Sequence, residues 1–289
     1  MGSTILQVVF AGVSVGMVYA LIALGFHLIY KGTGVINFAQ GEFALFGSML
    51  MWFFWVRLGL NGFLSFVLTV SCATLTAVIA ERVVFAPLRH QPHLALVMVL
   101  LGVSTLYTQG MLFAFGHDPL SVPLFSGKNS LVIFGAALSP QTLWVAGIFV
   151  ISLFLVQVLF TKTMWGRCMV ATMINEEGAK IIGINVNLVS LYAFGLSAAL
   201  SGAAGALVAP ITGAYYSKGF IYCIKGFTAG MVGGIETTTG VVVGGLLVGL
   251  IEIFIAVSAS PELAEISVFA VLILILLIRP DGIIGIRRD

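Results

Sequence analysis

The sequence predicts an all-α polytopic membrane protein: a bundle of eight or nine transmembrane helices, one of them short or re-entrant. Of its 289 residues, 60% are hydrophobic and only 8% are charged, and the mean hydropathy is +1.15. A soluble domain carries about 25% charged residues, so this chain has too few charges to cover a water-facing surface. Long apolar stretches, broken by glycine, proline and short polar segments, must therefore face lipid.

Eight apolar stretches are candidate membrane-spanning helices, for which about 20 residues are needed. They cover residues 5–30, 41–56, 63–80, 94–115, 141–160, 188–211, 241–257 and 266–278. A further apolar piece, 227–235, is shorter than one bilayer thickness and is either a half-helix or a re-entrant segment. The whole chain, 1–289, is predicted to form a single transmembrane domain.

Lysine and arginine collect on one side of this arrangement. The larger group comprises Lys31, Arg82, Arg89, Lys162, Arg167, Lys180, Arg279, Arg287 and Arg288. Arg57, Lys128 and Lys218 lie on the other side, and Lys225 is assigned to neither. Because cytoplasmic loops are enriched in Lys and Arg, the larger group is predicted to be cytoplasmic. Counting 227–235 as a crossing places the N-terminus outside and the C-terminus in the cytoplasm, which favours nine crossings.

Two loops are long enough to carry structure: an outer loop at about 116–140 and an inner loop at about 161–187. The inner loop is the most polar stretch of the chain, and it is where we expect a partner. Asn175 can cap a short helix there, and Gly183 can end it. Two acidic residues, Glu176 and Glu177, suit the positive end of the helix dipole.

A helix of about two turns is not stable alone, so this one must dock on something. Ala179, Ile182 and Ile184 are its expected apolar contacts. Two alternatives follow from the residues: a surface helix lying against the membrane, or a helix seated in a cleft of a cytoplasmic partner.

Three polar residues, Asn37, Gln40 and Glu42, fall between the first two apolar stretches, beside glycines that permit an unwound backbone. Irregular backbone at membrane depth is tolerated where protein or a water-filled cavity covers it. An intramembrane carboxylate is a functional candidate, so these residues are candidates to line a translocation path. The alternative is that Glu42 only caps the following helix near the interface.

Glycine occurs 34 times, often at four-residue spacing. The helix-packing candidates are Gly226, Gly230, Gly234, Gly244, Gly245 and Gly249. Small residues at this spacing let helix backbones approach closely in lipid. Glu236 is expected at a loop end, and Glu252 is a candidate to face the bundle interior.

Enzyme signatures are weak, and we expect no catalytic activity in this chain. Gly12–Gly16 matches G-x-S-x-G, but this motif needs a strand-to-helix turn and here lies inside an apolar helical run. The three cysteines stand alone, without metal-ligand spacing. No phosphate-binding G-x-x-x-x-G-K-[ST] motif is present, so energy for uphill transport must come from an ion gradient or another subunit.

Several segments together resemble the branched-chain amino acid ABC permeases (LivH-like). The sequence from Gly16 to Gly25, the sequence from Gly34 to Glu42, and the inner loop with Ala179 and Gly183 carry the first half of the resemblance. The C-terminal half matches at Lys225–Thr228, Gly233–Ile235, Gly244–Glu252 and Arg279–Gly285. The family usually has a small polar pair and then Pro-Gly-Ala after Gly233-Gly234-Ile235. This chain departs from it with Glu236–Val241, which puts that corner in doubt.

The resemblance implies a bacterial inner-membrane importer built from several subunits. A second, similar permease would complete the pore, an extracytoplasmic binding protein would deliver the solute, and two ATPase subunits would bind ATP and Mg²⁺. No cofactor is expected in this chain, and no nucleic acid. The inner-loop helix would be the cytoplasmic coupling helix, with Asn175, Glu176, Glu177, Ala179, Gly183 and Ile184 as its coupling residues.

The leading hypothesis is therefore the permease subunit of an ATP-driven importer for a branched-chain amino acid or a related small solute. Related permeases serve urea, other amides or aromatic acids, so the family name does not assign the substrate. The alternative is an ion-coupled secondary transporter, for which Glu42, Glu236 and Glu252 are the available acids.

Overall fold

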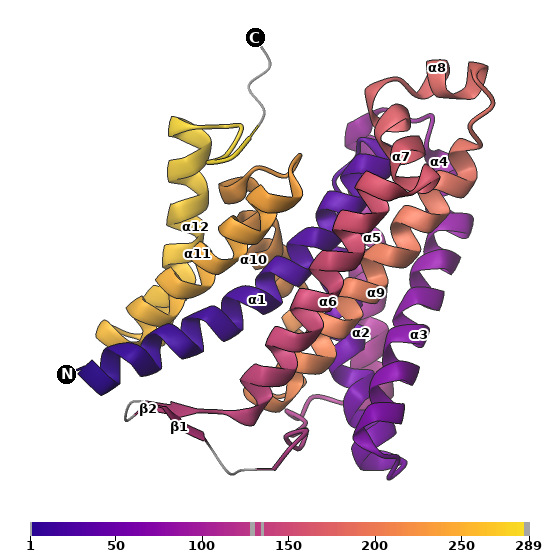
Figure 1. Ribbon diagram of the computed structural model, residues 1–289. Helices are drawn as coiled ribbons and strands as arrows, with labels where there is room; N and C mark the ends of the chain where they lie inside the picture. The colour runs from indigo at the N-terminus through magenta and orange to yellow at the C-terminus, as the bar shows by residue number, and fades with distance from the viewer. Residues whose placement is uncertain (1, 128–130, 134–135, 286–289) are drawn as a thin grey trace.

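The computed structural model describes residues 2–127, 131–133 and 136–285. The chain forms a helical bundle with one small β-hairpin (Figure 1). The helices are α1 Gly2–Thr33, α2 Gln40–Trp52, α3 Gly62–Ala80, α4 Ala86–Leu88, α5 His93–Phe115, α6 Pro140–Lys162, α7 Met164–Ile174, α8 Glu176–Ile181, α9 Val186–Thr212, α10 Lys218–Gly233, α11 Thr238–Ser258 and α12 Pro261–Ile278. Two π-helical turns, Phe53–Arg57 and Glu81–Phe85, extend α2 and α3.

Seven helices among the described residues are long and apolar enough to cross a membrane, which confirms the prediction of a polytopic membrane protein. They cover Ile5–Thr33, Gly62–Leu88, Leu94–Phe115, Pro140–Lys162, Val186–Thr212, Thr238–Ser258 and Pro261–Ile278. Helices α2 and α10 are shorter. The stretch predicted at 41–56 corresponds to α2 and its π-helical turn.

The prediction of the short segment at 227–235 was wrong in its bounds, because helix α10 begins at Lys218. Its first half carries Lys218 and Lys225, whose charges lower the mean hydropathy of this segment, so the apolar stretch was recognised only from residue 227. Both lysines have partners in the fold: Lys218 Nζ donates to the carbonyl oxygen of Gly213 at 3.0 Å, and Lys225 pairs with Glu252.

Two loops hold more structure than the sequence predicted. The outer loop contains the hairpin β1 Leu131–Ile133 and β2 Ala136–Leu138, which are antiparallel. The same loop is tied to the end of α9 by a β-bridge between Leu120 and Ala214. The inner loop contains α7 as well as the expected short helix α8.

The termini lie at opposite ends of the bundle (Figure 1). Helices α1, α6 and α12 end at the same end of the bundle as α8. This end therefore collects the described members of the larger basic group: Lys31, Arg82, Arg89, Lys162, Arg167, Lys180 and Arg279. Lys128, Arg287 and Arg288 lie outside the described residues.

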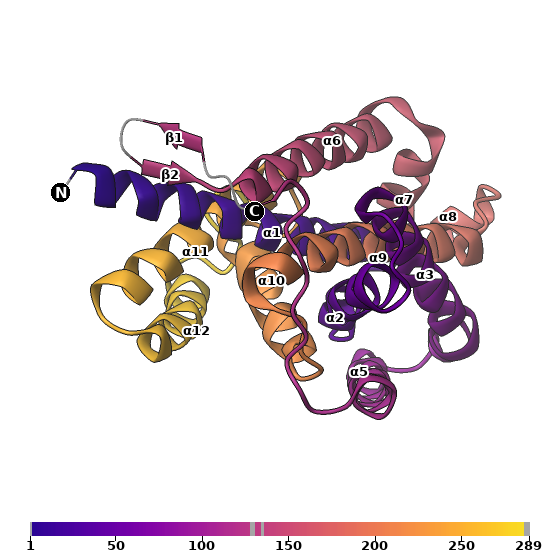
Figure 2. The same ribbon diagram turned by 90° about the horizontal axis from the view of Figure 1, so that it is seen from below.

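Helix α1 is the central element of the bundle. It crosses diagonally between a group formed by α10, α11 and α12 and a group formed by α2, α3, α5, α6 and α9 (Figures 1 and 2). Its inner part supplies fully buried side chains, among them Leu21, Ile22 and Phe26. Helices α5 and α12 lie at the edges, where only 28% and 11% of their most apolar windows are buried.

Glycine makes the contact between α1 and α11 close. A Cβ atom at Gly245 would overlap Ala20, and one at Gly249 would overlap the backbone of Gly16. Gly244 lies equally close to Ala229 of α10. Such backbone proximity gains dispersion energy that larger side chains would prevent.

The other predicted packing glycines differ among themselves. Gly226 lies against the side chain of Ile22. Gly234 ends α10 with a positive φ of 107° and touches Gly285 of the C-terminal segment. By contrast, a Cβ at Gly230 would meet only Ile235, at an ordinary 3.7 Å. Gly230 is therefore not required for close packing.

The corner after α10, where the sequence departs from the family pattern, is well formed. The Thr237 hydroxyl accepts a hydrogen bond from the Gly240 backbone N–H at 3.2 Å and so caps α11. The backbone N–H groups of Ile283 and Ile284 donate to the carbonyl oxygens of Val232 and Gly233. The C-terminal segment thereby fixes this corner without the missing proline.

We predict that Gly249→Ala destabilises the bundle by about 1–3 kcal/mol, because the added methyl group overlaps backbone that cannot move aside alone. Gly230→Ala is the matched control and should be neutral or stabilising by up to about 1 kcal/mol, since Ala favours a helix over Gly. Thermal unfolding of the detergent-purified proteins measures both. Equal effects of the two changes would contradict the assigned packing.

Candidate functional site

The segment between α6 and α9 presents a short, well-defined helix at one end of the molecule. Asn175 Oδ1 accepts a hydrogen bond from the Gly178 backbone N–H at 2.9 Å and caps α8. Gly183 adopts a φ of +87°, a left-handed conformation that glycine accommodates best. The N–H groups of Gly183 and Ile184 donate back to the carbonyl oxygens of Lys180 and Ala179, which closes the helix end.

The charged residues of α8 pair with each other. Lys180 Nζ lies 2.9 Å from Glu176 Oε1 and 3.6 Å from Glu177 Oε1. The hydrogen bond that the Lys180 ammonium donates to Glu176 raises the pKa of Lys180, and the second carboxylate adds to this. Exposed i,i+3 and i,i+4 pairs contribute little stability. Their main effect here is to hold the α8 side chains in one arrangement.

The apolar side chains of α8 divide differently from the prediction. Ala179 was expected to contact a partner, but it is only 3% exposed and faces the protein. Ile182 is 73% exposed, as expected, whereas Ile184 is half-buried. Ile181, which was not predicted as a contact, is 85% exposed. The register could not be predicted because it depends on how α7 and α9 hold the loop. The apolar contact surface that α8 offers is therefore Ile181 with Ile182.

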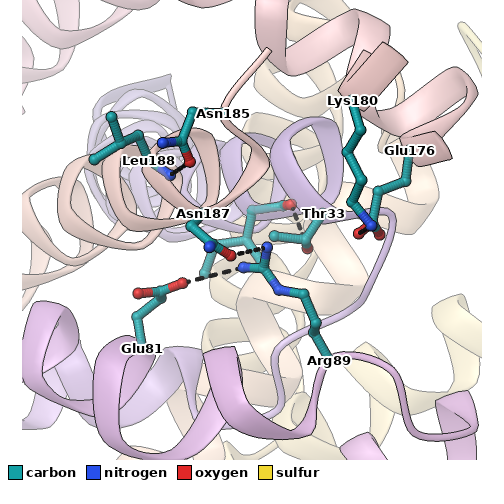
Figure 3. Close-up of polar contacts among 9 residues, drawn as sticks. Thr33, Glu81, Arg89, Glu176, Lys180, Asn185, Asn187 and Leu188 are labelled. Carbon is teal, nitrogen blue, oxygen red and sulfur yellow. Dashed lines mark hydrogen bonds and ion pairs between the residues drawn. The ribbon is translucent and has the colours of Figure 1, made fainter. Parts of the chain in front are cut away.

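A polar cluster lies below α8 (Figure 3), with the side chains of Arg89 and Glu81 buried and Asn187 exposed. The Arg89 guanidinium, from the turn before α5, lies 3.4 Å from Glu81 Oε1. It also donates to Asn187 Oδ1, in the first turn of α9, at 2.6 Å. The sequence analysis used Arg89 only as a basic residue. The sequence did contain a signal: Glu81 and Arg89 both follow the apolar stretch 63–80, so their opposite charges can neutralise each other.

The expected pathway residues Asn37 and Gln40 are both buried. Asn37 Oδ1 accepts from the Ala39 N–H at 2.9 Å and shapes the non-helical segment between α1 and α2. Gln40 Nε2 donates to Ser201 Oγ at 2.6 Å, and Gln40 Oε1 lies 2.8 Å from Ser197 Oγ. These hydrogen bonds fix the start of α2 against α9.

Glu42 does not cap its own helix, which removes the alternative considered for it. Its carboxylate accepts hydrogen bonds from Ser104 Oγ at 2.7 Å and Thr108 Oγ1 at 3.2 Å, both on α5. The backbone of α10 at Gly219 covers it from the other side. Glu42 is 1% exposed. It therefore joins α2 to α5 inside the membrane region.

A second acidic residue, Glu252 of α11, is also buried. Lys225 Nζ of α10 lies 2.6 Å from Glu252 Oε1 and 5.5 Å from the centre of the Tyr19 ring of α1. Three helices thus surround one ion pair. The prediction that Glu252 faces the bundle interior is confirmed, and its partner is the lysine that the sequence left unassigned.

The serine of the G-x-S-x-G match has a packing role in α1. Ser14 Oγ lies 2.8 Å from the Phe10 carbonyl oxygen and 2.9 Å from Thr142 Oγ1 of α6. The histidine on the same helix, His27, is held by the Ile235 carbonyl oxygen and by Thr238. This arrangement joins helices and offers no nucleophile with its base.

Seven long apolar helices among the described residues, together with close glycine packing, define a polytopic helical membrane protein. The chain belongs to the permease-component family of branched-chain amino acid transport systems, whose sequence profile matches residues 8–276. It is thus a membrane-spanning permease subunit of the ABC type, as the sequence resemblance predicted.

Two curated relatives show the extent of the likeness. The high-affinity branched-chain amino acid transport system permease protein LivH of Salmonella typhimurium is 30% identical, over 97% of this chain and 95% of that protein. BraD of Pseudomonas aeruginosa, described in the same words, is 29% identical over the same shares.

A solved structure shows the same fold. PsaBC from Streptococcus pneumoniae, in complex with Fab, superimposes with a TM-score of 0.56. The match covers 95% of this chain and 91% of that chain at 13% identity. At this identity the likeness concerns the fold alone.

We predict that Lys225→Met destabilises the protein by about 3–5 kcal/mol, because Glu252 would remain buried without its counter-charge. The double variant Lys225→Met/Glu252→Met should recover most of this loss, since a buried ion pair can be replaced by apolar side chains of similar size. A double-mutant cycle of thermal unfolding in detergent measures the coupling. Simple additivity of the two changes would show that the pair does not interact.

Proposed function

We propose that this chain forms one half of the translocation path of an ATP-driven importer for branched-chain amino acids. The relatives that match nearly its whole length are described as permeases of high-affinity branched-chain amino acid transport. The substrate assignment rests on those relatives. It does not rest on a binding site in this chain.

The observation that carries the proposed mechanism is α8. It is a short helix, fixed at both ends by Asn175 and Gly183, that offers Ile181 and Ile182 to a partner. Two isoleucines held on a preorganised helix lose little conformational entropy on docking. We assign α8 as the coupling helix, seated in a cleft of an ATPase subunit that binds ATP and Mg²⁺.

This assignment also sets the orientation. The α8 end carries the larger basic group, which favours the cytoplasm by the positive-inside rule. The N-terminus then lies outside and the C-terminus inside, which requires an odd number of membrane segments, and two short segments added to the seven long helices make nine. We count α2 and α10 as the two short ones. The non-helical segments before them, 34–39 and 213–217, are buried or half-buried except for Ser217, as irregular backbone at membrane depth requires.

The remaining partners fit the faces that the bundle leaves uncovered. Few residues of α5 and α12 are fully buried, and a second, similar permease is proposed to complete the pore beside these helices. An extracytoplasmic binding protein would deliver the solute to the end opposite α8. In this arrangement Glu42, with Asn37 and Gln40, supports the wall of the path by holding α5 to α2.

The ion-coupled alternative has less support. Such a transporter needs an intramembrane acid that can exchange its ion. Glu252 is paired with Lys225, and both carboxylate oxygens of Glu42 accept hydroxyl hydrogen bonds. Membership in a permease-component family argues in the same direction.

We predict that replacing both Ile181 and Ile182 by Ala lowers ATP-driven leucine uptake at least about tenfold in proteoliposomes of the assembled transporter. The apolar contact with the ATPase would be lost, whereas the permease would still fold, because both side chains are exposed. Phe154→Ala is the control: this residue is 66% exposed on α6, a helix to which no partner is assigned. Equal loss in both variants would remove the coupling role from α8.

We predict that Glu42→Ala reduces uptake about tenfold while the protein still inserts and assembles. Ser104 and Thr108 can return their hydrogen bonds to carbonyl oxygens of their own helix, so folding is spared. The link between α5 and α2 is nevertheless lost. Glu42→Gln keeps an acceptor oxygen and should retain a larger share of uptake. Full uptake by Glu42→Ala would show that the carboxylate has no part in the path.

A further inference from the structure

We infer that Arg89 is a positioning residue that transmits the movement of α8 to α5 through Asn187. The inference rests on the proposed role of α8 as the coupling helix. It adds a residue that neither the family nor the sequence pattern assigns.

The position of Arg89 in the chain is the first argument. It lies four residues before the start of α5, in the turn that joins α3 and α4 to that helix. Its partner Asn187 is the second residue of α9, five residues after the exposed Ile182. One side chain therefore connects the segment that follows α8 with the segment that precedes α5 (Figure 3).

The burial of this cluster is the second argument. The side chains of Arg89 and Glu81 are 6% and 0% exposed. Among the described residues, Arg89 Nε and Glu81 Oε2 have no hydrogen-bond partner. A buried ion pair with unsatisfied atoms adds little net stability. Its value must lie in geometry, because an arginine held by two acceptors fixes the distance between α3 and α9.

The third argument is the unequal packing of the two helices that Arg89 connects. Of the most apolar window of α9, 72% is buried, against 28% of that of α5. Leu106 of α5, for example, is 73% exposed. A displacement at the α8 end therefore moves α5 more readily than it deforms the core around α9.

Space for such a displacement exists beside the cluster. A cavity of about 150 Å³ is bounded by Arg89, by Glu176 of α8, by Ser190 of α9 and by Leu96 of α5. Close-packed interiors resist continuous deformation and change between discrete arrangements. A cavity between these elements allows Arg89 to change its contacts without displacing core side chains. The adjacent π-helical turn Glu81–Phe85 is the kind of local irregularity often found at functional sites.

The experiment uses Asn187→Ala, because this change leaves the Arg89–Glu81 ion pair intact and should not unfold the protein. The assembled transporter, with its ATPase subunits and binding protein, is reconstituted in proteoliposomes. Leucine uptake and ATP hydrolysis are measured in the same sample. Asn187→Ala is expected to lower the leucine transported per ATP at least fivefold, with the melting temperature unchanged within about 2 °C.

Rescue and control variants separate positioning from a purely structural role. Asn187→Asp keeps an acceptor oxygen for Arg89, now a charged one, and should retain at least half of the wild-type transport per ATP. Arg82→Ala removes an exposed arginine of the same π-helical turn and should change neither quantity. Unchanged transport per ATP in Asn187→Ala would overturn the inference, as would a loss that parallels a fall in melting temperature. Failure of the proposed function looks different: the wild-type complex itself would then show no ATP-dependent uptake.

Discussion

The structure depends on the close contact of α1 with α11 and α9. Lipid is as apolar as the helix surfaces, so helices associate in it through packing and polar bonds rather than by escaping water. The glycines of α11 bring its backbone against α1, and the α9 serines bond the start of α2. Every functional element is attached to this centre: α8 through α9, the Arg89 cluster through α3 and α9, and Glu42 through α2.

The two buried ion pairs have different positions relative to this centre. Lys225 and Glu252 join α10 to α11 beside Tyr19 of α1, where the surrounding helices pack closely. The Arg89–Glu81 pair lies at the edge of the bundle, beside a cavity and next to the loosely packed α5. The first pair is surrounded by helices that have little freedom to separate. The second can exchange partners, which suits a link between moving parts.

Local rules explain what could be predicted from the sequence. The cap at Asn175, the left-handed Gly183 and the acidic first turn of α8 depend on neighbours in the chain, and the structure has all three. The burial of Ala179 depends on how α7 and α9 hold the loop, so of the three expected apolar contacts only Ile182 is fully exposed, and the exposed Ile181 was not predicted. The first half of α10 was not recognised because a hydropathy scale treats each lysine as a solvated charge, whereas Lys218 and Lys225 have partners in the fold. The role of Arg89 was invisible for the same reason, since Asn187 lies 98 residues away.

The packing of α5 gives the movement its direction. Helix α5 is held to the bundle along one face. Leu96 and Leu100 pack in a cluster with Phe85, the Tyr107 hydroxyl donates to the Thr76 carbonyl oxygen, and Met111 packs in a cluster with Leu45. Ser104 and Thr108 donate to Glu42 near the middle of the helix. Leu106 and Phe113 are exposed, so this helix can tilt about the Glu42 contact more readily than a helix buried on all sides. With Glu42 as the fixed point, a small shift of Arg89 near the α8 end moves the far end of α5 in the opposite direction. Under the proposed coupling, this movement would convert an event at the ATPase into a change of access at the other side of the membrane.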